Sequence, residues 1–438
     1  MADITRIIPR WIAPVIPRET VLENHALVIK GKKILDLLPA VEAEKRYPDS
    51  HPVRLENHLL IPGLVNSHGH AAMSLLRGYA DDYDLMTWLT DHIWPAEAKL
   101  VEDAFVYSGA RLSAAEMLSG GTTCAADSYF FPESTARAFL EVGLRSQITA
   151  PIIHFSNSWA NNEQNHIDKT RAFINWSDQQ ELITAGFAPH APYSVSNSGF
   201  AQILDYAADT NAPIHLHLHE SAGEIQDHLS NHGCRPLARI NELGLLSPRL
   251  QLVHMTQLTP EEVSLIAAEG VQIAHCPQSN MKLGSGICPI TTLAAKGLNI
   301  SVGTDGAASN NDLDMLQELR SAALLAKVSE NNPSAVDAFT ALEMGTINGA
   351  RFLGLEQTIG SLEAGKSADL TAINFNDFSS QPVYHPISQL IYTATAQHVT
   401  HTWVNGKLLY DNQQFNYLDT KQVRADIQQW QRTIKALK

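Results

Sequence analysis

The stretch Leu60–His70, LIPGLVNSHGH, decides how this chain folds. It begins as an apolar run that predicts a buried strand, and it ends with His68 and His70 two residues apart. Alternate side chains of an extended segment share a face, so both imidazoles can point at one metal ion. A lone HxH pair also arises by chance on half-buried strands, so a metal site needs further donors.

Two other stretches supply such donors. IHLHLHE carries alternating histidines at His215, His217 and His219, and Glu220 follows them. SVGTDGAASN brings a carboxylate, Asp305. Three histidines and one aspartate form a donor set that suits a catalytic metal with space for a water molecule.

Between Leu59 and about Leu355 the pattern alternates between strands and helices. Eight nearly continuous apolar runs predict buried strands, which favours a (β/α)₈ TIM barrel in an α/β protein over an open doubly wound sheet. The predicted strands cover residues 59–66, 121–128, 146–153, 183–190, 212–219, 250–255, 271–276 and 298–305. Polar residues gather at the C-terminal ends of these strands, where barrel enzymes place their chemistry. These residues are His68, His70, His190, His217, His254, His275 and Asp305.

The sequences at both ends of the chain predict β structure. Hairpin signals occur at Lys30–Lys33 and at Asn405-Gly406, and residues 420–438 predict a polar helix. We therefore expect three segments: residues 1–58 and 361–438 build a small discontinuous β-sandwich domain with a terminal helix, and residues 59–360 form the barrel.

Composition narrows the functional class. The net charge of −15 argues against a nucleic-acid-binding protein. No apolar run approaches the roughly 18 residues of a membrane helix, and the N-terminal residues lack the features of a signal peptide. The four cysteines are widely spread, which suits a reducing cytosol. We expect a cytoplasmic protein without membrane association, assembled as a dimer or tetramer.

Several motifs together resemble the amidohydrolase superfamily, and within it the aminohydrolases that deaminate 5′-methylthioadenosine and S-adenosylhomocysteine. The resemblance spans almost the whole chain, including GSLEAGKSADL near the C-terminus. The motifs are PGLVNSHGH, HLHE, VHMT, HCPQSNMKLGSG and GTDGAASNN, at residues 62–70, 217–220, 253–256, 275–286 and 303–311.

The resemblance implies one divalent metal ion, with Zn²⁺ expected and Fe²⁺ as the alternative. Its ligands would be His68, His70, His217 and Asp305. Many dinuclear relatives carry a modified lysine after the fourth strand, whereas ITAGFAPHAP here contains none, which favours a single ion.

The resemblance also implies the catalytic and substrate-binding residues. Glu220 would move protons between the attacking water and the purine, and His254 and Asp305 would hold that water. Glu97 would bind the ribose hydroxyls, and His190 would contact the substrate together with Glu220 and Asp305. Trp88 would either line the substrate pocket or be an ordinary core tryptophan. The roles of His215 and His275 are left open.

One departure bears on the substrate. A homocysteine tail carries a carboxylate, which an arginine fork suits best. Between Arg145 and Arg171 the only cationic side chain is Lys169. We therefore expect deamination of 5′-methylthioadenosine and adenosine, and weaker action on S-adenosylhomocysteine. Two alternatives stay open: a guanine- or triazine-type aminohydrolase or chlorohydrolase on the same site, and a non-catalytic scaffold.

Overall fold

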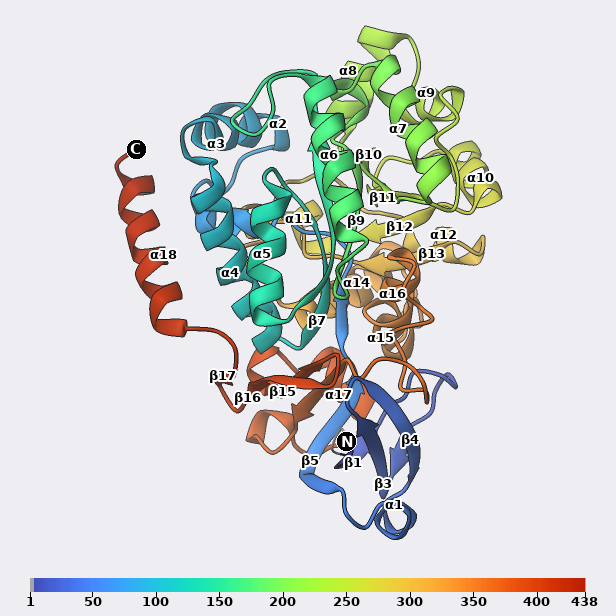
Figure 1. Ribbon diagram of the computed structural model, residues 1–438. Coiled ribbons are helices and arrows are strands. Elements are labelled where there is room, and N and C mark those ends of the chain that lie inside the picture. Colours follow the sequence, from blue (N-terminus) through green and yellow to red (C-terminus); the bar gives the residue numbers. More distant parts are fainter. Residues whose placement is uncertain (1–3, 438) are drawn as a thin grey trace. The chain divides into compact units, whose positions relative to one another are not determined.

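The computed structural model describes residues 4–437, and one of its two sheets has eight strands (Figure 1). The strands follow one another around the sheet in chain order, and the pairs from β8 to β13 are parallel. They are β6 (Leu64–Asn66), β7 (Thr122–Ser128), β8 (Arg145–Ile152), β9 (Ile183–Pro189), β10 (Ile214–Leu218), β11 (Leu250–His254), β12 (Gln272–His275) and β13 (Asn299–Val302).

Backbone hydrogen bonds close this sheet into a barrel. The N–H of Ser67, just after β6, donates to the carbonyl of Val302 in β13 at 3.0 Å. Every residue of β7, β8 and β11 is buried, as expected for barrel strands covered on both faces. The predicted α/β barrel is confirmed.

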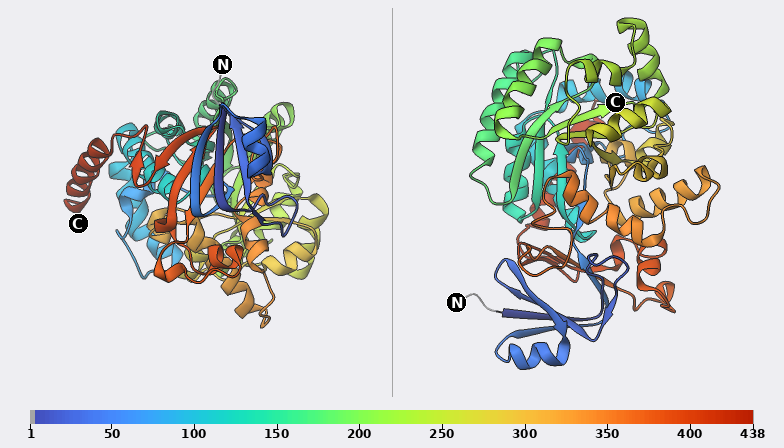
Figure 2. Two further views of the ribbon diagram at one scale, coloured as in Figure 1. Left: turned by 90° about the horizontal axis from the view of Figure 1, so that it is seen from below. Right: turned by 90° about the vertical axis from the view of Figure 1, so that its right-hand side faces the viewer.

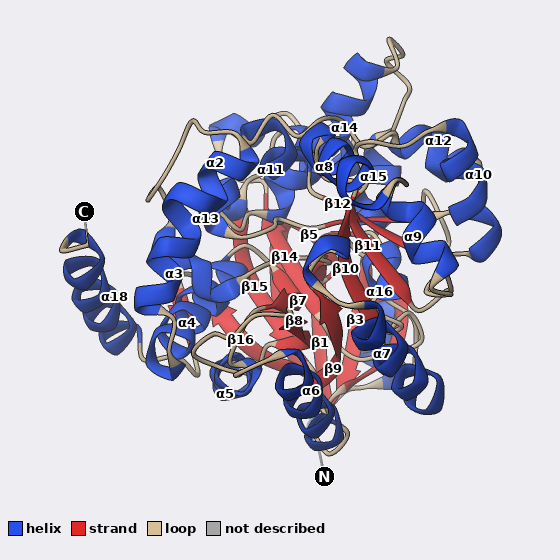
Figure 3. Cartoon of the chain, turned by 90° about the horizontal axis from the view of Figure 1, so that it is seen from above, coloured by secondary structure: helices blue, strands red, loops and turns tan. Residues whose placement is uncertain are grey.

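Helices follow the strands and surround the barrel (Figure 3). The sequence Thr259-Pro260-Glu261-Glu262 predicts a helix start with a capping box, which is present. The Thr259 side chain accepts from the N–H of Glu262, and the Glu262 carboxylate accepts from the N–H of Thr259. The helices are α4 (Asp103–Ser119), α5 (Pro132–Val142), α6 (Glu163–Ser177), α7 (Asn197–Thr210), α8 (Ala222–His232), α9 (Pro236–Glu242), α10 (Pro260–Glu269), α11 (Pro277–Lys282), α12 (Ile290–Ala295), α13 (Ala307–Asn310) and α14 (Met315–Ser329).

The segment after β6 differs from a simple barrel loop. It contains the 3₁₀ turn η1 (Ala71–Leu76), α2 (Leu85–Thr87), the π-helix η2 (Trp88–Ile93) and α3 (Trp94–Leu100). The apolar spacing of residues 100–119 in the sequence predicts one helix that starts at Leu100, but Val101 is extended, so α3 ends before it and α4 starts at Asp103. The π-helix lies directly before the turn that carries Glu97, and π-helical turns are frequent at functional sites.

The helix α18 (Thr420–Lys435) packs against the same region. Its Ile434 belongs to one apolar cluster with Trp88 and Phe105. The Trp430 and Phe105 rings meet edge to face with centroids 5.2 Å apart, and Arg111 pairs with Asp426 at 3.3 Å.

Both ends of the chain build a second, nine-stranded sheet, as the sequence predicted (Figure 2). Its order is β17-β16-β15-β14-β5-β1-β3-β4, and β2 pairs with β1. β5 joins the two ends of the chain, because it pairs in parallel with β1 and antiparallel with β14. The strands are β1 (Ile4–Ile12), β2 (Leu22–Glu23), β3 (His25–Lys30), β4 (Lys33–Pro39), β5 (His51–Pro62), β14 (Leu370–Asn374), β15 (Val399–Val404), β16 (Lys407–Asp411) and β17 (Gln414–Phe415).

Packing divides the chain into two compact units. The first comprises the residues up to Asn66 together with Ala115–Cys124 and Asp314–Leu418, and it includes α1 (Ala40–Arg46), α15 (Ala338–Met344), α16 (Ile347–Phe352) and α17 (Pro386–Tyr392). The second comprises Ser67–Ala114, Ala125–Leu313 and the residues from Asp419, and it contains every residue named as a candidate site residue. The boundaries at 58 and 360 stay a prediction. Among the described residues, no helix combines the length and apolarity needed to cross a membrane.

His166 makes the stability of the second unit depend on pH. Its ring is 0% exposed and lies against Trp159 and Phe130, and burial lowers its pKa from 6.5 to about 4. Because the unfolded chain takes up this proton first, the stabilisation is complete above pH 6.5 and is lost as the pH falls towards 4.

We expect His166→Phe to flatten the pH dependence of unfolding. Between pH 6.5 and 4 the wild-type chain should lose up to about 3 kcal/mol more unfolding free energy than the variant. Denaturant unfolding of metal-free protein at several pH values measures the difference, with exposed His232→Asn as the control. Parallel profiles for wild type and His166→Phe would contradict this assignment.

Candidate metal centre and active site

His68 and His70 lie just beyond the end of β6, as the predicted strand end at residue 66 implies. The strand predicted over residues 59–66 is itself divided, because residues 59–62 belong to β5 and residues 64–66 to β6. The segment that carries the two histidines stays extended because it bonds on both sides. The N–H of Asp305 donates to the carbonyl of His68 at 3.0 Å, and the N–H of Ser128 donates to the carbonyl of Gly69 at 3.0 Å. The alternation that the sequence suggested therefore holds without a regular strand, and both imidazoles turn towards Asp305.

Hydrogen bonds hold the rings of His70 and His217 at their Nδ1 atoms. His70 Nδ1 lies 2.6 Å from the carbonyl of Ser128, and His217 Nδ1 lies 2.9 Å from the carbonyl of His190. A carbonyl only accepts, so each Nδ1 carries the proton and each Nε2 presents a lone pair. This is how proteins commonly orient histidines that bind a metal.

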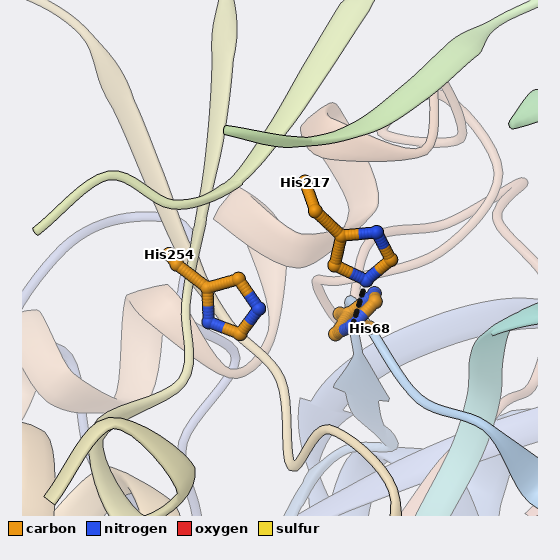
Figure 4. Close-up of side chains that lie close together, drawn as sticks. All are labelled: His68, His217 and His254. Atoms are coloured by element: carbon orange, nitrogen blue, oxygen red, sulfur yellow. Dashed lines mark hydrogen bonds between the residues drawn. The ribbon is translucent and has the colours of Figure 1, made fainter. Parts of the chain in front are cut away.

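The ligand atoms have the spacing of a metal site. His68 Nε2 lies 3.2 Å from His217 Nε2, a contact visible in Figure 4, and Asp305 Oδ1 lies 3.3 Å from Nε2 of both His68 and His70. Atoms that bind one zinc ion at 2.0–2.1 Å in a tetrahedral arrangement are separated by about 3.3–3.4 Å. These three contacts therefore have the spacing of a metal site, and the N₃O donor set suits a divalent metal. All four residues, together with His254, fall into two overlapping metal-binding groups that share His68.

Asp305 is held as an ionised acceptor. Its Oδ2 accepts from the hydroxyls of Ser279 at 2.7 Å and Ser309 at 2.9 Å. Burial by itself raises the pKa of Asp305, but the close contacts with the His68 and His70 rings outweigh it and keep the pKa well below its usual value. The carboxylate therefore stays available to a cation.

His254 and Glu220 lie beside this group. The His254 ring points towards His68 and His217 (Figure 4), and its Nε2 lies 3.7 Å from Glu220 Oε2. Its Nδ1 lies 2.9 Å from Asn280 Oδ1, which leaves Nε2 free to face the site. Burial raises the pKa of Glu220, and the nearby charge of Asp305 raises it further, which favours a carboxyl that takes and releases protons.

The backbone is strained at two of these positions. His254 has φ 74° and Asp305 has φ 62°, both in the left-handed region that costs non-glycine residues about 1–3 kcal/mol. Such strain is typical of functional sites. Here it occurs where β11 ends and in the turn that follows β13.

Glu97 is placed by a residue that the sequence analysis missed. The hydroxyl of Tyr129 donates to Glu97 Oε1 at 2.5 Å, and the Tyr129 ring centroid lies 6.4 Å from that of His70. Tyr129 links the candidate metal centre to Glu97. Its position directly after β7, at the edge where barrel chemistry gathers, was the available signal.

The other two predicted substrate residues, His190 and Trp88, lie in different surroundings. The His190 ring centroid lies 5.2 Å from that of His217, and burial lowers the pKa of His190 to about 4, so the ring is neutral. Trp88 is buried in the apolar cluster with Phe105, and its Nε1 donates to the carbonyl of Ala80 at 3.1 Å. A role for Trp88 against the substrate stays a prediction.

Serine and asparagine side chains of α11 were also missed as supporting residues. Ser279 holds Asp305, and Asn280 holds His254. Both belong to the HCPQSN motif, so the motif was visible but the roles of its polar residues required the geometry. His275 is buried, and its role stays open.

The comparisons with known proteins agree with this arrangement. Residues 59–409 match the amidohydrolase family. A 5-methylthioadenosine/S-adenosylhomocysteine deaminase from Saccharophagus degradans is 45% identical, over 98% of this chain and 96% of that protein. A 5′-deoxyadenosine deaminase from Methanobrevibacter smithii is 38% identical, over 91% of each chain.

Solved structures extend the likeness to the fold. The crystal structure of an adenosine deaminase from Xanthomonas campestris with bound zinc has a TM-score of 0.95 and 41% identity, over 99% of each chain. An atrazine chlorohydrolase from Arthrobacter aurescens has a TM-score of 0.90 at 23% identity, over 97% of this chain and 99% of that one, which shows the shared fold alone. The match over residues 59–409 and the identity to these relatives show that the chain belongs to the amidohydrolase family.

Proposed function

We propose that this protein hydrolytically deaminates the adenine base of nucleosides, releasing ammonia and the inosine-type product. The observation that carries the proposal is the convergence of three imidazole Nε2 atoms and Asp305 Oδ1 beside Glu220 and His254. The names of the relatives support adenosine-type substrates. A cytoplasmic location and a dimeric or tetrameric assembly go with this proposal as expectations from the sequence.

The proposed metal is a single divalent ion held by His68, His70, His217 and Asp305. Zinc is the proposed species, supported by the donor spacing and by the zinc in the adenosine deaminase structure, and Fe²⁺ remains the alternative. When bound, such an ion supplies a Lewis acid and lowers the pKa of a coordinated water towards about 7.

The protein side chains then handle the protons. Glu220 takes a proton from the attacking water and delivers it to the purine ring nitrogen. The free Nε2 of His254 accepts a hydrogen bond from the same water and orients it. The ionised Asp305 takes the remaining proton and passes it to the departing amine, so that ammonia leaves as the carbonyl forms.

The ribose is proposed to bind at Glu97. Tyr129 occupies Oε1 of Glu97, which fixes the carboxylate and leaves Oε2 for the sugar hydroxyls. Fixing the ribose keeps the base against the attacking water, and a displacement of about 1 Å can cost roughly 100-fold in rate. A guanine or triazine lacks a ribose, so a fixed carboxylate at this place favours a nucleoside over these alternatives.

The 5′ end is proposed to favour short, uncharged substituents. Lys169, the one cation of the segment between Arg145 and Arg171, donates to the carbonyl of Trp159 and lies 5.4 Å from the centroid of that ring. Arg171 donates to the carbonyl of Gln202 at 3.2 Å. These cations are engaged within the protein, which supports a preference for 5′-methylthioadenosine and adenosine.

Ammonia release from a panel of nucleosides tests the activity and the preference together. We expect a high kcat/KM for 5′-methylthioadenosine and adenosine, and a lower value for S-adenosylhomocysteine, whose carboxylate gains no arginine fork. Guanine and triazines serve as the ribose-free comparison. If S-adenosylhomocysteine gave the highest kcat/KM, the argument from the cations would be wrong, and turnover of none of these compounds would favour a non-catalytic scaffold.

Glu220→Gln should bind metal and lose turnover. Glutamine is nearly isosteric but cannot take the proton of the water, so kcat should fall by about 10²–10⁴-fold. Asp305→Ala is the contrasting variant, because removal of a ligand should abolish metal binding and activity together. Metal analysis and steady-state kinetics on both variants measure the outcome. Near wild-type turnover in metal-loaded Glu220→Gln would refute the role of Glu220.

Substitution of Glu97 or Tyr129 should weaken the contact with the ribose without changing metal binding. Loss of a charged hydrogen bond in Glu97→Gln should lower kcat/KM for adenosine about 10- to 150-fold, and Tyr129→Phe should lower it about 2- to 12-fold. Metal content should stay at the wild-type level. The control is 2′,3′-dideoxyadenosine, which should be a poor substrate and respond little to either change. Equal rates for adenosine and its dideoxy analogue in the wild type would exclude Glu97 as the ribose anchor.

A further inference from the structure

A chain of hydrogen-bonded side chains runs from His68 into the interior of the barrel. His68 Nδ1 lies 2.8 Å from His215 Nε2, and His215 Nδ1 lies 3.1 Å from Gln251 Oε1. Gln251 and Gln147 bond reciprocally, with amide N to O distances of 2.6 and 3.2 Å. The residues come from three strands, β10, β11 and β8, and from the segment after β6.

This chain lies where a barrel normally holds apolar side chains. His68, His215, Gln251 and Gln147 are each no more than 2% exposed. A buried polar group that lacks its partner costs about 1–3 kcal/mol, so such a chain is favourable only when each member bonds to the next. These hydrogen-bonded side chains of the barrel interior therefore fix the orientation of the His68 ring.

Its protons have two consistent arrangements. In one, His215 Nδ1–H donates to Gln251 Oε1, His215 Nε2 accepts from His68 Nδ1–H, and His68 Nε2 keeps a lone pair. In the other, the amides of Gln251 and Gln147 are both turned over, so that Gln251 Nε2–H donates to His215 Nδ1, His215 Nε2–H donates to His68 Nδ1, and His68 Nε2 carries a proton that excludes a metal. Only the first arrangement agrees with Nε2 of His68 as a ligand beside His217 and Asp305.

His68 differs in this respect from the other two histidine ligands. His70 and His217 bond at Nδ1 to backbone carbonyls, which fix the proton on Nδ1 whatever the neighbouring side chains are. His68 bonds to a second imidazole, which can accept or donate. The two rings are nearly coplanar across this bond, with centroids 5.0 Å apart and an angle of 17° between the planes, which is the geometry of an in-plane hydrogen bond.

We propose that His215, oriented by Gln251 and Gln147, is a positioning residue that sets the tautomer of His68 and thereby the affinity of the site for its metal. This role rests on the metal centre proposed above. Loss of partners of this kind typically lowers metal affinity by about 10–100-fold.

The test measures Zn²⁺ binding to the full chain after metal removal, by competition with a chelating indicator. His215→Phe keeps a planar ring but cannot accept a hydrogen bond, and its Zn²⁺ dissociation constant should rise about 10–100-fold. His215→Gln places an amide oxygen within reach of His68 Nδ1 and should restore most of the affinity. Gln251→Leu leaves His215 in place but frees its tautomer, and should weaken binding by a smaller factor.

Thr149→Val is the matched control. Thr149 lies two residues beyond Gln147 on β8, is 2% exposed, and its hydroxyl donates to the backbone carbonyl of Asp127 at 3.2 Å. Its Zn²⁺ affinity should equal that of the wild type. Thermal unfolding of each metal-free variant separates lost affinity from lost folding, and ¹⁵N-histidine spectra of the zinc form should show His68 protonated at Nδ1.

The outcomes distinguish the role proposed for His215 from the proposed metal centre. Unchanged zinc affinity in His215→Phe and Gln251→Leu, with zinc bound normally by the wild type, would overturn the role of His215 alone. Equal losses in His215→Phe and His215→Gln would show that ring packing matters rather than an acceptor, and would also overturn it. A wild-type chain that binds no zinc would overturn the proposed metal centre together with this role.

Discussion

The backbone bonds that hold residues 67–69 between the ends of β13 and β7 are the constraint on which the site depends. They close the barrel and keep the HxH segment extended without making it part of a strand. The His68 and His70 side chains therefore face the same way. Asp305 lies beside them because its own N–H donates to the carbonyl of His68, which is one of the bonds that close the barrel. The same backbone hydrogen bonds therefore close the barrel and place the metal-ligand candidates.

A second consequence is electrostatic. The closure brings three imidazole lone pairs and a carboxylate within 3.2–3.3 Å contacts in a buried place. Lone pairs at such distances repel one another unless a proton or a cation lies between them. Serines, backbone carbonyls and a buried polar relay hold the ligands in place, so the protein maintains an arrangement whose natural complement is positive charge.

Much of this arrangement was predictable from the sequence. The seven barrel strands from β7 to β13, the terminal sheet and the family were correct, because apolar periodicity and the strand-end histidines are local signals. The division of the predicted strand 59–66 between β5 and β6 and the break at Val101 were not, because both depend on bonds to distant segments or on one backbone torsion. The roles of Tyr129, Asn280 and Gln251 were not predicted for a similar reason. An isolated tyrosine or amide has no recognisable spacing in the sequence, and its role depends on the partner that folding brings into contact with it.

The strand that joins the two ends of the chain has a consequence for biosynthesis. Pro62 on β5 pairs with Leu370 on β14, so the partner of this edge is made only after the whole barrel sequence. At 5–20 residues per second, ribosomal synthesis leaves that edge of β5 without its neighbour for roughly 15–60 s. An unpaired edge invites association with other chains. The nascent protein thus passes through a period in which the finished half of its terminal sheet must be kept from aggregating, and that period is set by the length of the barrel inserted between its strands.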